Sequence, residues 1–315
     1  MKSVETENAT KPNVLVLMAT YNGAKWLVEQ MESVLNQCDV NVHVLVGDDR
    51  SSDETGRLIA EHWASDNRVK YRVWCESSGS AGANFRRLIR NTEVEGYDFV
   101  ALADQDDIWE PRKLACAIEK LMQSGAHGYS CAVRSFWPDG SKKILPQVAV
   151  PRHADFLFEG AGQGCTFTIR SELFARVRDY CIKYSDETEA LHYHDWLLYL
   201  LARAWGYKWY FDQEPWVNYR QHGGNEIGSR GGLRAVTKRL ELIRKGWFGA
   251  QVAAALKLFT HARSGDQLIT TFSQIFTKPD SVVRRARLCC FVVQHGRRRF
   301  SDRLVLAVSA AAGWI

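Results

Sequence analysis

The feature that most constrains the fold is a regular alternation of strand-like and helix-like segments over the first hundred residues. Short apolar runs predict strands at residues 13–19, 42–46, 69–74 and 97–103. Apolar residues at helical spacing predict helices between them, at residues 24–36, 55–63 and 83–90. This order of elements predicts an α/β fold, with a mainly parallel, doubly wound sheet that is flanked by helices.

The alternation changes after Pro111. The patterns there predict helices at residues 113–123 and 194–205, and strands at 128–136, 165–169, 207–211 and 216–220. Three glycines, at positions 160, 162 and 164, indicate a loop before one of these strands. We expect three parts: a flexible N-terminus at residues 1–12, the α/β domain at 13–228, and a basic helical C-terminal extension at 229–315.

Composition excludes disordered and fibrous architectures, because 46% of the residues are hydrophobic and 24% are charged. The formal net charge is only +5, but arginines crowd the C-terminal extension. They are Arg284, Arg285, Arg287, Arg297, Arg298, Arg299 and Arg303. Such a cluster favours a polyanionic partner, and we expect an anionic membrane surface rather than nucleic acid. A solvated helix face is the alternative interpretation.

The cysteines and the apolar stretches bear on the compartment. None of the eight cysteines forms a C-x-x-C pair, and we expect them to be buried free thiols of a reducing compartment. Residues 1–12 are polar, without the apolar core of a secretory signal. The apolar stretch at 304–315 is too short to span a bilayer. The expectation is a cytoplasmic protein that attaches peripherally to the membrane.

Polar residues gather where the predicted strands end. Ligands of doubly wound sheets bind beyond the carboxyl ends of the strands. The strongest cluster, Asp104-Gln105-Asp106-Asp107, directly follows the fourth strand. Three carboxylates this close repel one another unless a cation lies among them, and oxygen ligands suit Mg²⁺ or Mn²⁺. The alternative is a helix N-cap before Pro111, for which one aspartate would suffice.

Two further strand ends carry candidate binding groups. Asp48 and Asp49 end the second strand, and a carboxylate there could accept the imide N–H of a pyrimidine. Asp53 is explained by helix capping, but the Asp48-Asp49 pair is not. The segment Ala19-Thr20-Tyr21-Asn22-Gly23 is a strand-to-helix turn with backbone N–H groups and an aromatic face.

In this order and spacing, the three motifs resemble those of family 2 glycosyltransferases of the GT-A fold. The Asp-Gln-Asp-Asp-Ile-Trp form at 104–109 and the segment 219–225, Tyr-Arg-Gln-His-Gly-Gly-Asn, are similar to bacterial rhamnosyltransferases that build surface polysaccharides. The resemblance extends over residues 13 to 228. It implies a GT-A domain with a helical C-terminal extension.

The resemblance also implies a role for each matching residue. Nucleotide-sugar binding would involve Thr20, Tyr21, Asn22, Asp48, Asp49, Asn84 and Asp104. The metal, Mn²⁺ or Mg²⁺, would be held by Asp106 and His222, and the acceptor side would be formed by Gly162, Gly164 and His194.

Asp195 matches the catalytic base of the family, which usually has Glu-Asp where this chain has His194-Asp195. As the opening of a helix, Asp195 also lies where the helix dipole favours a carboxylate. Simple helix capping is the alternative.

The implied reaction is an inverting transfer of a sugar to a hydroxyl of a glycan or lipid-linked acceptor. The donor would be dTDP-L-rhamnose or a UDP-hexose. Two other functions stay open: a non-catalytic module that binds sugar nucleotides or glycans, and a nucleotidyltransferase. The latter would need a glycine-rich basic loop for a triphosphate, and residues 20–25 contain only one Gly and one Lys.

Overall fold

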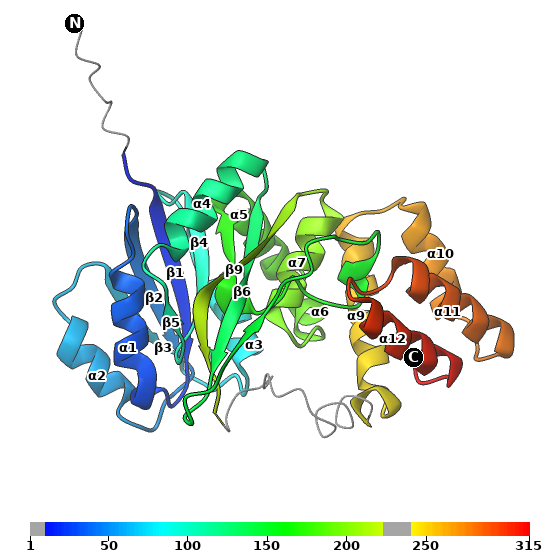
Figure 1. Ribbon diagram of the computed structural model, residues 1–315, viewed down its shortest axis with the longest axis horizontal. Helices are drawn as coiled ribbons and strands as arrows, with labels where there is room; N and C mark the ends of the chain where they lie inside the picture. The colour runs from blue at the N-terminus through cyan, green and yellow to red at the C-terminus, as the bar shows by residue number, and fades with distance from the viewer. Residues whose placement is uncertain (1–9, 223–240) are drawn as a thin grey trace, which may run out of the picture.

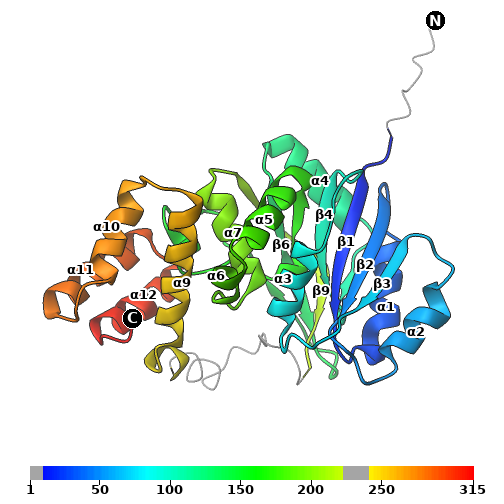
Figure 2. The ribbon, with the colours of Figure 1, turned by 180° about the vertical axis from the view of Figure 1, so that it is seen from behind.

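The computed structural model describes residues 10–222 and 241–315, and in these ranges nine strands form one curled sheet (Figure 1). The strand order is β3-β2-β1-β4-β8-β6-β9-β5, and β7 pairs with β6. Helices cover both faces of the sheet, and the C-terminal helices pack at one end of the molecule (Figures 1 and 2). This arrangement confirms the predicted α/β class.

The first half of the domain follows the predicted alternation. Its elements are β1 Asn13–Thr20, α1 Ala24–Leu35, β2 Asn41–Asp48, α2 Thr55–Trp63, β3 Val69–Val73, α3 Ala81–Arg90 and β4 Phe99–Asp104. Strands β2 and β4 pair in parallel with the two edges of β1, and β3 extends the sheet in parallel beyond β2. The carboxyl ends of β1, β2 and β4 therefore lie side by side.

The second half adds antiparallel neighbours and a long return strand. Its elements are β5 Ile108–Trp109, α4 Lys113–Ser124, β6 Gly128–Phe136, β7 Lys142–Leu145, β8 Thr168–Arg170, α5 Ser171–Lys183, α6 Ser185–Glu189, α7 His194–Ala204 and β9 Trp209–Arg220. Strand β8 runs antiparallel to both β4 and β6, while β9 runs parallel to β6. The long strand β9 pairs with β6 and, near its C-terminal end, with β5, which directly follows the acidic motif.

Two predicted strand assignments were wrong. Residues 165–169 do not form one strand: Gly164–Thr166 is a 3₁₀ turn, and β8 begins only at Thr168. The segments 207–211 and 216–220 are parts of the single strand β9, which contains Pro215. The pairing of β6 with β9 shifts register on both sides of Ala132, where β9 has extra residues around Pro215, which cannot donate a ladder hydrogen bond.

The hydrophobic core lies on the two faces of the sheet. Val14, Val16 and Met18 of β1 are buried on the face that α1, α2 and α4 cover. Alternate residues such as Leu15 and Leu17 join the opposite cluster, beneath α3, α5 and α7. Alternation along a strand that is buried on both faces explains why its sequence is apolar throughout.

The second cluster continues into the C-terminal extension. Its helices are α9 Trp247–Ala262, α10 Gln267–Phe276, α11 Val282–His295 and α12 Phe300–Ala311. Phe248, Phe259, Phe272 and Leu288 belong to the same buried cluster as the α7 core. The predicted boundary near residue 228 lies outside the described residues, as do positions 1–9 of the predicted N-terminal segment. The helices of the extension are thus packed onto the α/β domain.

The arginine cluster and the cysteines differ from expectation. Only 6% of the Arg298 side chain and 11% of the Arg284 side chain are exposed, so these two arginines form ion pairs within the protein and do not present their charge to a partner. Arg287 and Arg299 are exposed. All eight cysteines are free, but only Cys131, Cys165 and Cys181 are buried. Among the described residues, none of the helices has the length and apolarity that a membrane crossing requires.

Candidate active site

The carboxyl ends of β1, β2 and β4 open onto a cavity of about 500 Å³. Ten of the residues expected in the site line it: Thr20, Tyr21, Asp49, Asn84, Asp104, Asp106, Gly162, Gly164, His194 and Asp195. They come from both halves of the domain and from elements up to 175 residues apart. Asn22, Asp48 and His222 are not among the lining residues.

Asp49 shapes one wall of the cavity. Its carboxylate accepts hydrogen bonds from Ser77 Oγ at 2.9 Å, Ser78 N at 2.6 Å and Gly79 N at 3.2 Å. These bonds hold the loop after β3 against the end of β2, and Ser77 and Gly79 themselves face the cavity. Asp49 is therefore within reach of a ligand in the cavity and also orders the adjacent wall.

Asp48 and Asn22 support the turns beside the cavity. Asp48 is fully buried, and it accepts hydrogen bonds from Ser51 N at 2.6 Å and Tyr71 Oη at 2.9 Å. Asn22 has a positive φ of 48°, and its Oδ1 accepts a hydrogen bond from Ser52 N at 2.8 Å. Both side chains form hydrogen bonds to neighbouring residues of the protein and do not line the cavity.

Asn84 of α3 joins neighbouring strand ends. Its Nδ2 donates to Gly47 O at 2.8 Å, and its Oδ1 accepts from Trp74 Nε1 at 2.8 Å. Nearby, the buried Oγ1 of Thr20 has no hydrogen-bond partner among the described residues. A buried hydroxyl without a partner costs free energy, so a ligand that bonds it would bind more tightly.

Gln105 clamps the first turn to the acidic motif. Its side-chain amide accepts from Tyr21 N at 2.8 Å and donates to Tyr21 O at 2.9 Å. A Cβ on Gly23 would lie 2.1 Å from Gln105 Oε1, so this approach requires glycine. The clamp leaves the Tyr21 side chain 55% exposed at the cavity edge.

The three aspartates of the acidic motif occupy two environments. Asp104 and Asp106 line the cavity, whereas Asp107 is fully buried below them. Asp107 Oδ1 accepts from Arg220 N at 3.1 Å. Burial raises the pKa of Asp107 well above its usual range, and the negative charges of Asp106 and Asp104 raise this pKa further. Burial also raises the pKa of the neighbouring Cys165 thiol, which bonds Asp107.

Asp106 lies next to the imidazole expected to share its metal. His222 Nε2 is 2.6 Å from Asp106 Oδ2, and the His222 ring stacks on Trp26 with centroids 4.1 Å apart. Arg220 Nε donates to Asp106 O at 2.8 Å. A carboxylate and an imidazole in contact fit the donor preferences of Mn²⁺, and the carboxylate fits Mg²⁺. Asp104, the other cavity aspartate of the motif, has a carboxylate oxygen within 4.8 Å of ligand atoms of Asp107 and Cys165.

The opposite wall contains His194 and the glycine loop. His194 stacks on Phe85 with centroids 4.0 Å apart, and burial lowers its pKa to about 3, with a smaller contribution from Arg86. The imidazole is therefore neutral at physiological pH. A Cβ on Gly164 would lie 2.5 Å from His194 Nε2, so a glycine there permits close approach. Gly162 has a φ of +115°, which favours glycine as well.

Asp195 is the second residue of α7 and faces the same cavity. Its Oδ1 accepts a hydrogen bond from Trp196 N at 2.6 Å. The N-terminus of a helix stabilises a negative charge, so this position favours the carboxylate form. Asp195 is thus not the cap of α7, which is Tyr193, but a carboxylate in the first turn that faces the cavity.

A glycosyl transferase family 2 model matches residues 15–174 of the chain. The chain belongs to this family. It is 36% identical over 236 residues to the dTDP-rhamnosyl transferase RfbG of Shigella flexneri, which covers 75% of this chain and 82% of that protein. It is 34% identical over 156 residues to WfgD of Escherichia coli, a UDP-Glc:α-D-GlcNAc-diphosphoundecaprenol β-1,3-glucosyltransferase. That match covers 48% of this chain and 57% of WfgD.

The fold is that of known glycosyltransferases. The mannosyltransferase PcManGT of Pyrobaculum calidifontis, solved with GDP-Man and Mn²⁺, superposes with a TM-score of 0.51 at 17% identity. The match covers 96% of this chain and 87% of that one. These findings confirm the family and the GT-A fold expected from the motifs.

Several lining residues of this glycosyltransferase were missed in the sequence. Gln105 sits inside the acidic motif, and Tyr193 and Tyr219 also face the cavity. Burial raises the pKa of Tyr219, and nearby Cys165 and the acidic motif raise it further, so its hydroxyl stays protonated. The sequence offers one signal for Gln105, which is its position between Asp104 and Asp106, two residues expected in the site. The tyrosines lie within two or three residues of Asp195 and His222.

Proposed function

We propose that this glycosyltransferase moves L-rhamnose from dTDP-L-rhamnose to a hydroxyl of a glycan or lipid-linked acceptor in bacterial cell-surface polysaccharide synthesis. The observation that carries the proposal is the 36% identity to RfbG, which extends over three quarters of the chain. A UDP-hexose is the second candidate donor, because WfgD uses UDP-Glc and a lipid-linked acceptor. Family membership favours transfer over the binding-module and nucleotidyltransferase alternatives.

The proposed metal is Mn²⁺ or Mg²⁺, held by Asp106 and His222 with Asp104 beside them. The support is the 2.6 Å approach of His222 Nε2 to Asp106 Oδ2 and the position of both cavity aspartates at a strand end. A divalent cation there would neutralise charge on the departing diphosphate. Arg220 would orient the motif, because its Nε donates to the Asp106 carbonyl and its backbone N–H to Asp107.

Asp195 is the proposed general base of an inverting single displacement. The acceptor oxygen attacks the anomeric carbon as the bond from that carbon to the diphosphate breaks, and the acceptor proton passes to Asp195. His194 lies on the same wall but is a poor base, because burial holds its pKa near 3. His194 is therefore not the proposed base, and Asp195 is the carboxylate on this wall that faces the cavity.

A donor screen tests the proposed function. The protein with Mn²⁺ is heated in the presence of dTDP-L-rhamnose, dTDP, UDP-glucose or UDP. A ligand at 100 times its Kd stabilises the fold by about 2.7 kcal/mol. We expect dTDP-L-rhamnose to give the largest stabilisation and to support sugar transfer. Stabilisation and transfer with UDP-glucose alone would contradict the donor assignment and leave the family unaffected.

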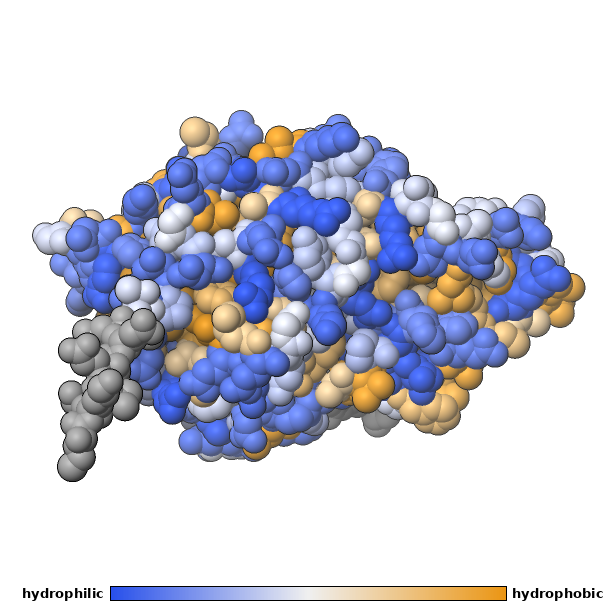
Figure 3. All heavy atoms as spheres, turned by 90° about the horizontal axis from the view of Figure 1, so that it is seen from above, coloured by the Kyte–Doolittle hydropathy of each residue, from blue (hydrophilic) through white to orange (hydrophobic). Residues whose placement is uncertain are grey.

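The proposed location is the cytoplasmic face of the membrane, with attachment through α12. Phe300, Leu304 and Val308 are 61%, 47% and 63% exposed and recur every four residues, so they share one helix face. Figure 3 shows apolar side chains at the end of the molecule that the C-terminal helices form. Arginines beside an apolar face favour anionic lipid, and Arg299 is exposed next to Phe300. Binding to anionic vesicles but not to neutral ones is expected; binding to neither would contradict it.

A further inference from the structure

The acceptor wall of the cavity consists of two short segments, 162–164 and 193–195. Both segments lie at the start of an element, since one leads into a 3₁₀ turn and the other opens α7. The residues that precede each segment therefore help to fix its position through the contacts that they make. The C-terminal extension makes contacts of this kind to both.

Gln251 of α9 holds the chain immediately before Asp195. The Gln251 side chain is buried, its Oε1 accepts from His192 N at 2.7 Å, and its Nε2 donates to Ala190 O at 3.2 Å. The segment 190–192 has no regular secondary structure, so its backbone groups need such partners. One glutamine side chain thus bonds two backbone groups within five residues of the proposed base.

Arg86 of α3 holds the same segment from the opposite side. Its NH1 donates to Leu191 O at 2.9 Å and His192 O at 2.8 Å, while Glu189 accepts from its NH2 at 2.8 Å. The segment is therefore clamped between the α/β domain and the extension. Trp247 of α9 adds ring contacts to His192 and Tyr193, each with centroids 6.0 Å apart.

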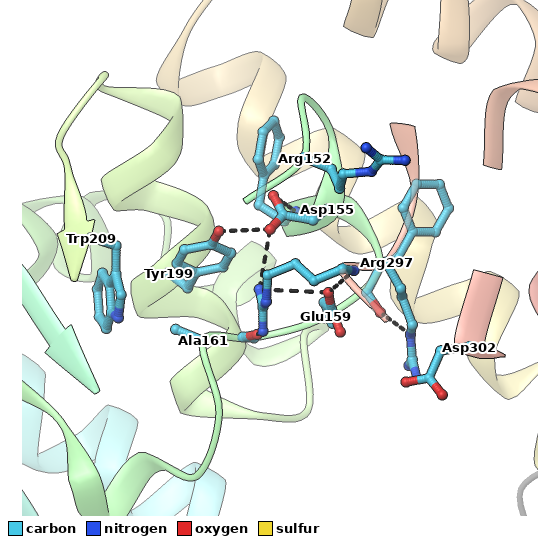
Figure 4. A network of polar contacts seen from close by, with 12 residues as sticks. Arg152, Asp155, Glu159, Ala161, Tyr199, Trp209, Arg297 and Asp302 are labelled. Carbon is cyan, nitrogen blue, oxygen red and sulfur yellow. Dashed lines mark hydrogen bonds and ion pairs between the residues drawn. The ribbon is translucent and has the colours of Figure 1, made fainter. Parts of the chain in front are cut away.

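A second anchor joins the extension to the chain before the glycine loop. Arg298, between α11 and α12, donates through NH2 to Gly160 O at 2.7 Å and through NH1 to Asp155 at 3.1 Å. Asp155 also accepts from Tyr199 Oη at 2.8 Å (Figure 4). It accepts from Arg203 at 2.9 Å as well, and Tyr199 and Arg203 both belong to α7. The network therefore links the extension, residues 155–160 and the helix that begins at His194.

We infer that the C-terminal extension is a positioning element for the acceptor wall, and that Gln251 is a positioning residue for Asp195. The inference rests on the proposed role of Asp195 as base. The donor wall is built independently, because Asp49 and Asn84 make their bonds within residues 20–84. Loss of Gln251 should accordingly reduce turnover without weakening donor binding.

The test compares Gln251→Leu with a matched control, Tyr180→Phe. Tyr180 Oη donates to Leu258 O at 2.8 Å, so the control also removes a buried hydrogen bond that involves α9, but away from residues 190–195. A misplacement of about 1 Å can cost about 100-fold in rate. We expect Gln251→Leu to lower kcat by about 10- to 100-fold at unchanged donor Kd, and Tyr180→Phe to leave kcat near wild type.

The double variant Gln251→Leu with Asp195→Asn separates the inference from the proposed function. If Gln251 acts through Asp195, its effect on kcat disappears once the base is absent, because such effects are not additive. A full multiplicative loss in the double variant would overturn the positioning role. An unchanged kcat in Gln251→Leu, or an equal loss in Tyr180→Phe, would overturn it as well. Normal turnover of Asp195→Asn alone would instead refute the assignment of the base.

Discussion

Nε2 of His222 lies 2.6 Å from Oδ2 of Asp106, although 116 residues separate them in the chain. The end of β9 makes this approach possible. Arg220 is bonded to the acidic motif through both its backbone N–H and its Nε, so the two residues that follow begin from a fixed point. Stacking on Trp26 then restricts the His222 ring. The contact brings together the two residues expected to share a metal.

Asp106→Asn tests that metal site. The amide keeps the size of the side chain but removes its charge, so Mn²⁺-dependent donor binding and sugar transfer should both be lost while the fold remains. Calorimetry of donor binding with and without Mn²⁺ measures the effect. Glu29→Gln is the control, because Glu29 is paired with Arg220 and its side chain is more exposed than that of Asp106. Full activity of Asp106→Asn in the presence of a chelator would refute a metal role for Asp106.

Gly164→Ala tests how closely the proposed acceptor wall is packed. The added Cβ would lie 2.5 Å from His194 Nε2 and 3.4 Å from Asp195 Cβ, so the wall must shift. Overpacking of this kind costs about 1–3 kcal/mol of stability, and we expect the rate of transfer to fall with little change in donor Kd. Thermal unfolding and steady-state kinetics measure the two effects.

Gly249→Ala on α9 is the matched control for that substitution. Its new Cβ would meet only Cα of Ile315 at 3.8 Å, and alanine is favoured over glycine inside helices by about 0.5–1 kcal/mol. Gly249→Ala should therefore be neutral or stabilising and fully active. If Gly164→Ala behaved in the same way, close packing against His194 would have no functional importance.

The lowered pKa of His194 should make the stability of the fold depend on pH. Its pKa is about 3 in the folded protein and about 6.5 when unfolded, so between these values the unfolded chain binds a proton that the folded chain does not. The free energy of unfolding therefore falls as pH drops below 6.5, by up to about 1.4 kcal/mol per pH unit. Above pH 6.5 both states are neutral and this contribution vanishes.

His194→Gln removes the titrating group while keeping a polar side chain. Denaturant unfolding at pH 7.0 and 5.5 compares the two proteins. The wild type should lose more stability than the variant over this interval, because only its unfolded state gains the additional proton. Equal losses in both proteins would show that His194 titrates normally in the folded state.

Much of the fold could be predicted because its signals are local. Strands β1 and β4 are buried on both faces and β2 mainly on one, and each appears in the sequence as a largely apolar run followed by polar residues. Side-by-side parallel pairing then brings Thr20, Asp49 and Asp104 to one edge of the sheet. The predicted cavity residues followed from this rule together with the family resemblance.

The supporting contacts could not be predicted in the same way. Gln105 and Gln251 act through backbone groups 84 and 59 residues away in the chain, and a single amide leaves no periodic pattern. Arg298 looked like a surface charge in a basic tail, but its partners Asp155 and Gly160 are known only from the tertiary structure. Asp48 was expected at the nucleotide because it ends β2, yet the adjacent Tyr71 and Ser51 occupy its carboxylate.

Donor calorimetry beside initial rates of transfer, both on Asp195→Asn, measures most directly whether Asp195 is the base. Asparagine keeps the size of the side chain and an oxygen that can accept the hydrogen bond from Trp196 N, so stability should stay near wild type while basicity is lost. If Asp195 is the base, donor affinity should be unchanged and transfer should fall by about 10² to 10⁴-fold, which is the usual contribution of a general base. Weakened donor binding would instead indicate a metal or donor ligand, and normal turnover would contradict the assignment of Asp195 as the base.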